Sequence, residues 1–246
     1  MLNSTDLKPT DDAESRPRPD AAMFAARLAQ ASPHRIIEEA ASAMPGRLAV
    51  VSSFGAESAV LLKFVADIDR SLPVLFLDTL WLFKETLAYR DTLTAHLGLT
   101  DVRTVTPSPS TLALQDPKRD LCFRNNDACC GIRKVAPLDR ELAAFDGWIS
   151  GRKRYQGGDR AGLEVVETDG RRIKFNPLAR LNPAELQAIF ELARLPRHPL
   201  ETVGFASVGC VPCTSRLVGG AARDGRWSGL AKTECGIHAR LRAALS

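Results

Sequence analysis

No apolar run in this chain approaches the roughly 18 residues that a transmembrane helix needs. The first twenty residues contain Pro9, Pro17, Pro19 and several acids, and they lack the apolar stretch of a signal peptide. We therefore expect a cytoplasmic protein that makes no contact with a membrane.

A strong charge of either sign is also missing. The chain has 33 Lys and Arg against 29 Asp and Glu, a net charge of +4. This excess is too small to indicate a nucleic-acid-binding protein, so we predict no nucleic acid partner. It would suit a small anionic substrate if the basic residues cluster locally. The sequence shows no internal repeat and no low-complexity tract.

The 246 residues, of which 45% are hydrophobic, suit one α/β domain with appendages. We predict a disordered, proline-rich arm over residues 1–20, a nucleotide-binding domain over 21–205, and a segment of the same domain over 206–246. That last segment is rich in Gly and Cys. Cytosolic thiols stay reduced, so the six cysteines indicate metal ligands or catalysts rather than disulfides.

Apolar runs alternate with helical patterns along the domain. Strands are predicted at 47–52, 73–77, 102–106 and 147–150, helices at 33–44, 59–67, 83–97, 137–145 and 182–195, and a hairpin at 163–167 and 172–175. The alternation predicts an α/β fold, with a parallel twisted sheet flanked by helices and a cysteine-rich C-terminal segment.

Residues 53–58, with the sequence SFGAES, connect a predicted strand to a predicted helix. Such a junction presents free backbone N–H groups and the positive end of a helix dipole, which suit a phosphate or sulfate. Gly55 would let the backbone approach the ligand, and Ser53 and Ser58 would add hydroxyl donors. Alone, the segment favours a short βα loop with a serine cap, and it is not a Walker loop, since the Gly-Lys-Ser/Thr ending is missing.

Five of the six cysteines fall into three groups: the adjacent pair Cys129 and Cys130, the C-x-x-C of Cys210 and Cys213, and Cys235 alone. Four thiolates in the first two groups predict a metal site, with zinc and an iron–sulfur cluster as candidates. Adjacent cysteines diverge too much for one tetrahedral ion, whereas the corners of a cubane lie apart, so we favour [4Fe–4S]. The alternative is a buried apolar cysteine pair beside an unrelated turn.

Cys235 is left over from that set and lies in the segment KTECGIH, residues 232–238. A nucleophilic thiolate needs nearby cations and access, which Lys232, His238 and Gly236 would supply. We predict that Cys235 is catalytic. Lys134 follows the cysteine pair and would bridge a cluster and a substrate; the alternative is an ordinary solvated cation on a helix.

These segments together resemble the phosphoadenylyl-sulfate/adenylyl-sulfate reductase family over about residues 47–240. The resemblance rests on SSFGAES (52–58), Asp78-Thr79 with Glu85-Thr86, CCGIRKVAPL (129–138), WISGRKRYQ (148–156), KFNPL (174–178), GCVPC (209–213) and KTECGIH (232–238). The first segment also resembles the modified pyrophosphate loop of the adenine-nucleotide α-hydrolase-like superfamily, with Phe54 and Glu57 in place of the usual glycine and aspartate. Leu80 and Trp81 stand where glycine is frequent in the family.

The resemblance implies reduction of adenosine 5'-phosphosulfate to sulfite and AMP, in sulfate assimilation and cysteine biosynthesis. Cys235 would form an S-sulfocysteine intermediate, and Cys129, Cys130, Cys210 and Cys213 would hold the [4Fe–4S] cluster found in the branch that uses this substrate. No thioredoxin-like segment follows, so we expect an external thioredoxin or glutaredoxin as electron donor. The family also hints at a homo-oligomer. Cys122 has no family role and is interpreted as structural.

The nucleotide is expected along residues 53–58 and 77–79, at the carboxyl ends of the strands. Candidate ligands for the phosphosulfate are Lys134, Arg160, Arg223, Arg226 and His238, with Arg152, Lys153 and Arg154 as weaker candidates.

Three other functions compete with this reading. The first is a reductase of the 3'-phosphorylated nucleotide, which would contain no iron. The second is an iron–sulfur tRNA sulfur-transfer enzyme, which should keep a Gly-Gly-x-Asp-Ser loop and a basic RNA-binding face. The third is a zinc-stabilised binding module, whose function would survive Cys235→Ser.

Overall fold

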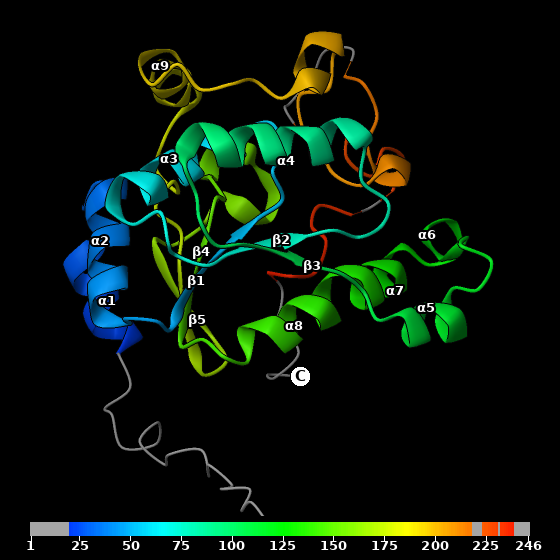
Figure 1. The fold of residues 1–246 in the computed structure, drawn as a ribbon, viewed down its shortest axis with the longest axis horizontal. Helices are drawn as coiled ribbons and strands as arrows, with labels where there is room; N and C mark the ends of the chain where they lie inside the picture. Colours follow the sequence, from blue (N-terminus) through cyan, green and yellow to red (C-terminus); the bar gives the residue numbers. More distant parts are fainter. Residues whose placement is uncertain (1–19, 218–222, 231, 239–246) are drawn as a thin grey trace, which may run out of the picture.

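A six-stranded sheet forms the centre of the protein in the computed structural model, which describes residues 20–217, 223–230 and 232–238 (Figure 1). The predicted arm over 1–20 therefore lies outside the described residues except for Asp20, and so does the end of the C-terminal segment. The strands are β1 (Leu48–Ser52), β2 (Val74–Leu77), β3 (Val102–Val105), β4 (Gly147–Ser150), β5 (Val166–Asp169) and β6 (Arg172–Phe175).

The helices before β4 are α1 (Ala21–Leu28), α2 (Pro33–Ala43), α3 (Ser58–Ile68), α4 (Lys84–Leu97), α5 (Pro109–Gln115), α6 (Leu121–Arg124), α7 (Asn126–Cys130), the π-helix η1 (Gly131–Val135) and α8 (Ala136–Leu142). After β4 come the 3-10 turns η2 (Arg154–Gln156) and η3 (Gly158–Arg160), helix α9 (Pro183–Leu192), and the 3-10 turns η4 (Pro199–Val203) and η5 (Val211–Cys213).

The strand order is β3-β2-β1-β4-β6-β5. Every pair is parallel except β5 with β6, which form the predicted hairpin at one edge. All residues of β1, β2 and β4 are buried, as expected for parallel strands covered on both faces. The predicted fold class is confirmed. The first hairpin strand spans Val166–Asp169, so it begins three residues later and ends two residues later than predicted.

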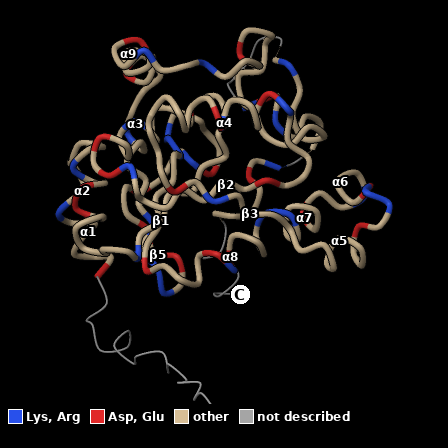
Figure 2. Tube along the Cα trace, in the orientation of Figure 1, with Lys and Arg blue, Asp and Glu red and all other residues tan. Residues whose placement is uncertain are grey.

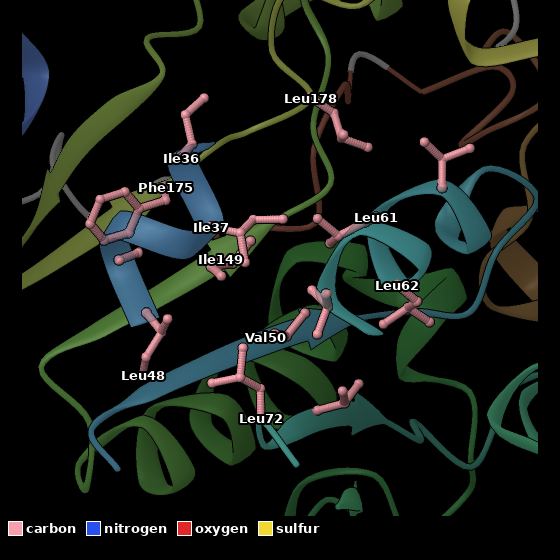
Figure 3. Packing of buried hydrophobic residues seen from close by; sticks show 14 of the residues in the cluster. Ile36, Ile37, Leu48, Val50, Leu61, Leu62, Leu72, Ile149, Phe175 and Leu178 are labelled. Atoms are coloured by element: carbon pink, nitrogen blue, oxygen red, sulfur yellow. The ribbon is translucent and has the colours of Figure 1, made fainter. Parts of the chain in front are cut away.

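Helices cover the two faces unequally (Figure 1). On one face, helices α1 to α4 and α9 pack on alternate strand residues to form the main core, whose centre includes Val50, Leu62 and Ile149 (Figure 3). On the other face, α8 packs on a smaller cluster around Trp148, to which Ile237 of the C-terminal segment also contributes. The second face is therefore completed by residues from the far end of the chain.

Local signals explain where several helices begin and end. The Ser32 side chain accepts a hydrogen bond from the Arg35 N–H at the start of α2, as its Ser-Pro sequence predicts. Asn182 and Glu185 form a capping box at α9, which ends at Leu192 rather than at residue 195. Residues 107–133, for which the sequence predicts no element, contain α5, α6, α7 and the start of the π-helix.

Basic and acidic residues are interspersed over the outer helices (Figure 2). Across the described residues, no helix combines the length and the hydropathy that crossing a bilayer requires.

Candidate active site

One cavity of about 180 Å³ opens where β1, β2 and β4 reach their carboxyl ends. Its lining includes every substrate-binding candidate taken from the sequence, together with the predicted nucleophile: Ser53, Gly55, Ser58, Lys134, Arg160, Arg223, Arg226, His238 and Cys235. The weaker candidates Arg152 and Lys153 line it as well. The fold therefore gathers residues that are up to 185 positions apart in the sequence, from Ser53 to His238.

The β1–α3 loop forms the sheet side of the cavity. Phe54 adopts a left-handed backbone conformation (φ 46°), and its side chain is fully buried against Phe76, with ring centroids 5.3 Å apart. Gly55 lies so close to the backbone of Val208 that a Cβ on Gly55 would be 3.1 Å from the Val208 carbonyl oxygen. Phe54 thus anchors in the core a loop whose backbone faces the cavity, which explains an aromatic residue where the superfamily commonly has glycine.

Glu57 in the same loop is a site residue that the sequence did not reveal. Its carboxylate accepts hydrogen bonds from Lys153 Nζ (2.7 Å) and Gln156 Nε2 (2.7 Å), and it also contacts the Tyr155 hydroxyl. Burial raises the pKa of Glu57, but Lys153 more than offsets this, so the pKa lies below its usual value. The carboxylate is therefore ionised and neutralises the buried Lys153 ammonium beside the loop.

A second acidic residue, Glu167, neutralises another buried pair of cations. It forms ion pairs with Arg152 and with Lys174 Nζ (3.0 Å), and it accepts a hydrogen bond from Asn176 Nδ2 (2.8 Å). Burial and the neighbouring Arg152 lower the pKa of Lys174 to about 8. Lys174 and Asn176 belong to the KFNPL motif, which is the sequence signal from which their place beside the cavity could have been predicted.

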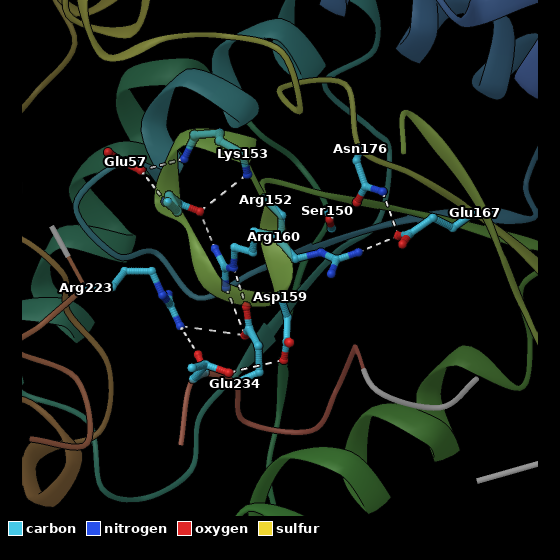
Figure 4. A network of polar contacts seen from close by, with 12 residues as sticks. Glu57, Ser150, Arg152, Lys153, Asp159, Arg160, Glu167, Asn176, Arg223 and Glu234 are labelled. Carbon is cyan, nitrogen blue, oxygen red and sulfur yellow. Dashed lines mark hydrogen bonds and ion pairs between the residues drawn. The ribbon is translucent and has the colours of Figure 1, made fainter. Parts of the chain in front are cut away.

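The third acidic residue is Glu234, next to Cys235. Arg160 binds both carboxylate oxygens, and Arg223 lies 3.7 Å from one of them (Figure 4). Burial and the nearby Arg160 lower the pKa of Arg223 to about 10. Arg226 donates a hydrogen bond from Nε to the Cys213 carbonyl (3.1 Å) and lies over the Trp227 ring. Three of the expected phosphosulfate ligands are therefore already positioned by the protein.

His238 differs from the basic group that its place in the sequence suggested. Its ring stacks on Trp148, with centroids 5.6 Å apart and planes 9° apart. Burial, together with the charges of Arg152 and Lys174, holds the pKa of His238 well below its usual range, so the imidazole is neutral at pH 7. Its buried Nδ1 has no hydrogen-bond partner among the described residues. A neutral imidazole can still offer one N–H to a ligand, but it adds no positive charge.

The four predicted metal ligands lie together beside the cavity, and all four are buried. Asn126 lies between the two groups: its Nδ2 donates to Cys213 Sγ (3.3 Å), and its Oδ1 lies 3.9 Å from Cys130 Sγ. Burial and the nearby Cys130 raise the pKa of Cys129 to about 12. Cys122 packs against Cys129 in a small apolar cluster.

Within the described ranges, no group of three or more His, Cys, Asp or Glu side chains is arranged to hold a metal ion. The adjacent cysteines end α7, and the π-helix η1 that follows turns the chain so that Lys134 faces the cavity. Although burial lowers the pKa of Lys134, the negative charges of Cys210 and Cys235 raise it above its usual value. Lys134 therefore lies near both the cysteine cluster and Cys235.

The chain has clear relatives among known proteins. The phosphoadenosine phosphosulfate reductase domain model matches residues 47–216. An adenosine 5'-phosphosulfate reductase from Mesorhizobium japonicum is 47% identical over 229 residues, which is 92% of this chain and 90% of that protein. A protein of the same name from Mycolicibacterium smegmatis is 35% identical over 93% of this chain and 98% of its own length. A relative from Gloeobacter violaceus, named phosphoadenosine 5'-phosphosulfate reductase, is 40% identical over 85% of this chain and 89% of its own length.

Solved structures show the same fold. The phosphoadenylyl-sulfate reductase from Candida auris aligns with a TM-score of 0.67 and 24% identity, over 82% of this chain and 98% of that one. An FMN adenylyltransferase from Candida glabrata aligns with a TM-score of 0.53 and 15% identity, over 80% of this chain and 74% of that one.

Proposed function

Because this chain belongs to the phosphoadenosine phosphosulfate reductase family, we propose that it reduces adenosine 5'-phosphosulfate to sulfite and AMP, with Cys235 as the nucleophile. Within the family, the relatives named for this substrate support the activity and a role in sulfate assimilation.

The observation that carries the proposal is the composition of a single cavity. It brings together a loop suited to a nucleotide, a set of cations suited to a phosphosulfate, and a partly exposed thiol. Lys134, Arg160, Arg223 and Arg226 come from three separate segments, yet all face the same space as Cys235. Such an arrangement suits transfer of an anionic group to sulfur better than ATP-dependent adenylation, since the loop lacks the glycine and aspartate of ATP-cleaving relatives.

The sheet side of the cavity would bind the nucleotide. The backbone of Gly55 and the hydroxyls of Ser53 and Ser58 line the cavity at the start of α3, where the helix dipole favours an anion. The arginines would bind the phosphosulfate oxygens, because a guanidinium offers parallel N–H donors to an oxyanion. His238 would donate one hydrogen bond through a neutral ring.

In the first half-reaction, the Cys235 thiolate attacks the sulfur of the substrate. A bond forms between Sγ and that sulfur, and the bond from the sulfur to the phosphate oxygen breaks. The electron pair leaves with AMP, and an S-sulfocysteine remains on Cys235. Lys134, Arg160 and Arg223 would stabilise the negative charge that builds up on the departing phosphate.

In the second half-reaction, a thiolate of thioredoxin or glutaredoxin attacks Cys235 Sγ. Sulfite leaves with the electron pair of the sulfur–sulfur bond, and a mixed disulfide forms. The second thiol of the donor then resolves this disulfide and restores the Cys235 thiolate. Overall, two electrons pass from the dithiol to the sulfate sulfur, and two protons are released.

We further propose that Cys129, Cys130, Cys210 and Cys213 hold a [4Fe–4S] cluster. The donor set fits, because soft thiolates suit iron–sulfur clusters and the four thiols are buried, with Asn126 in contact with one thiol of each pair. A bound cluster would supply structural support and a fixed charge beside Lys134. The protein's own contribution is to keep Lys134 charged and directed at the substrate.

The decisive experiment compares two nucleotides. Anaerobically purified protein is supplied with thioredoxin and with either adenosine 5'-phosphosulfate or its 3'-phosphorylated form, and sulfite release is measured. We expect a strong preference for the unphosphorylated nucleotide. Iron and sulfide analysis of the same sample tests the cluster separately from the activity.

Two results would contradict the proposal. A preference for the 3'-phosphorylated nucleotide would break the link between the four cysteines and substrate choice. The 40% identical protein from Gloeobacter violaceus is named for that nucleotide, so the comparison is a real test. No sulfite from either nucleotide, in protein that contains iron, would favour a sulfur-transfer enzyme acting on tRNA.

A further inference from the structure

The segment that carries Cys235 is attached to the body of the protein on both sides of that residue. After Cys235, Ile237 packs into the cluster around Trp148, and His238 stacks on the Trp148 ring. Before Cys235, Glu234 forms ion pairs with Arg160 and Arg223. Gly236, in a left-handed conformation (φ 87°), makes the turn between the two attachments. Cys235 is thus held between an apolar attachment and a charged one.

The charged attachment is well buried for an ion pair. The side chains of Arg160 and Glu234 are only 10% and 11% exposed, and the side chain of Arg223 is 16% exposed. Arg160 contacts one carboxylate oxygen through Nε and donates to the other through Nη2 at 3.0 Å. Arg223 also donates to the Thr233 carbonyl at 2.9 Å. Two arginines that line the cavity therefore bind the residue next to the nucleophile.

Arg160 also connects Glu234 to the β1–α3 loop. Arg160 Nη1 contacts Gln156 Oε1, and Gln156 Nε2 donates to Glu57 Oε2 at 2.7 Å. Figure 4 shows this chain of contacts from Glu57, through Arg160, to Glu234. These contacts use three of the five N–H groups of a guanidinium, so two remain for a substrate anion.

We propose that Glu234 is a positioning residue for the first half-reaction: its carboxylate orients Arg160 and Arg223 and holds Cys235 against the cavity. This inference rests on the proposed function, because it assigns the arginines to the phosphosulfate. Removal of the carboxylate releases the charged attachment but leaves the apolar one at Ile237 and His238. Cys235 then reaches the substrate sulfur less often, while the fold and the second half-reaction are kept.

The test uses Glu234→Gln in the full-length, cluster-containing protein. Gln keeps the shape and removes the charge. In the absence of nucleotide we expect alkylation of Cys235 by iodoacetamide to become about tenfold faster, because a charged hydrogen bond exceeds a neutral one by roughly that factor in an equilibrium constant. Rates are measured across a pH series, so that a change in the thiolate fraction is separated from a change in access.

Asp127→Asn is the matched control. It breaks the contact between Asp127 and Lys232, two residues before Glu234, with an Asp127 side chain that is 90% exposed. An ion pair whose carboxylate is so well solvated contributes little, so the alkylation rate should stay within about twofold of the wild type. Arg160→Gln should also speed alkylation, and the double variant should show less than the summed effect, since both changes remove the Arg160–Glu234 ion pair.

Single-turnover experiments complete the test. With adenosine 5'-phosphosulfate at saturation, Glu234→Gln should form S-sulfocysteine about tenfold more slowly, as seen by intact mass, for the same loss of one charged contact. Release of sulfite from preformed S-sulfocysteine by thioredoxin should keep the wild-type rate. Equal alkylation and sulfonation rates in variant and wild type, or a lowered Tm alone, would overturn the inference. A wild type that is never sulfonated would instead overturn the proposed function, and the alkylation rates would still test the attachment.

Discussion

The two walls of the cavity are built by different means. The sheet wall, around Ser53 and Gly55, follows buried strands, and Phe54 fixes it in the core. The wall from the C-terminal segment, around Arg223 and Cys235, is held by ion pairs, by turns and by one small apolar attachment at Ile237 and His238. Apolar burial is cooperative and involves many residues, whereas each ion pair can break alone. The sheet wall is therefore suited to constant nucleotide binding, and the other wall to a nucleophile that meets first a substrate and then a protein donor.

Cys235→Ser should have the largest effect, because it abolishes the chemistry of the C-terminal wall and leaves nucleotide binding by the sheet wall intact. The hydroxyl of serine is not ionised near neutral pH, so sulfite release should fall on the order of 10⁴-fold, as for loss of other enzymatic nucleophiles. Nucleotide binding by calorimetry and the iron content should stay at wild-type values, because the sheet wall and the four buried cysteines are unchanged. Full activity in this variant would show that Cys235 is not the nucleophile.

The sheet wall could be predicted from the sequence because its signals are local. Short apolar runs gave β1, β2 and β4 to within one residue, and the strand–loop–helix order placed residues 53–58 at the sheet edge. The four cysteines and Cys235 could be assigned to two groups because their spacing is itself a local pattern. In the structure, Cys235 lines the cavity and packs against the cluster of Cys210, Cys213 and Trp227.

The acidic partners could not be predicted, because each depends on a long-range pairing. Glu57 meets Lys153, and Arg160 meets Glu234, across 96 and 74 positions. In the sequence these glutamates look like ordinary surface acids. The low pKa of His238 has the same origin, since it depends on burial against Trp148 and on the distant cations Arg152 and Lys174. Periodicity and spacing carry no information about such pairs.

Phe76→Ala should test the sheet wall with the next largest effect. Phe76 lies at the centre of β2, is fully buried, and packs edge-to-face on Phe54. Truncation leaves a cavity, so the free energy of unfolding should fall by about 3–5 kcal/mol. Denaturant unfolding followed by circular dichroism measures this loss. A loss well below 1 kcal/mol would mean that Phe54 does not depend on this packing.

Two buried histidines, one in the body of the protein and one in the C-terminal wall, should affect the pH dependence of stability differently. His198 is fixed in the body by a hydrogen bond with Thr86 (3.1 Å) and by the Leu200 N–H (3.2 Å), and burial lowers its pKa to about 4. In the unfolded chain, His198 binds a proton near pH 6.5, whereas in the folded chain it stays neutral down to about pH 4. Stability should therefore fall as the pH drops from about 6.5 to 4, by about 3 kcal/mol from this residue.

His198→Gln should remove that part of the pH dependence, measured as denaturant midpoints between pH 4 and 7. His238 also has a lowered pKa, but its Nδ1 has no partner within the described residues. Its segment can detach on protonation without global unfolding, so His238→Gln should change the slope much less. Equal changes in both variants would mean that the segment of His238 does not detach independently of the body of the protein.

The smallest predicted effect distinguishes two glycines next to the C-terminal wall. A Cβ at Gly209 would overlap the Arg226 guanidinium, which is flexible and can move aside. A Cβ at Gly225 would lie 2.5 Å from the backbone oxygen of Ser215, which cannot. Gly209→Ala should therefore change stability by less than about 0.5 kcal/mol but raise the KM for the nucleotide by up to about tenfold, through loss of one charged hydrogen bond from Arg226. Gly225→Ala should instead cost about 1–3 kcal/mol of stability. Thermal unfolding and KM for both variants measure the difference, and an unchanged KM in Gly209→Ala would remove Arg226 from the substrate ligands.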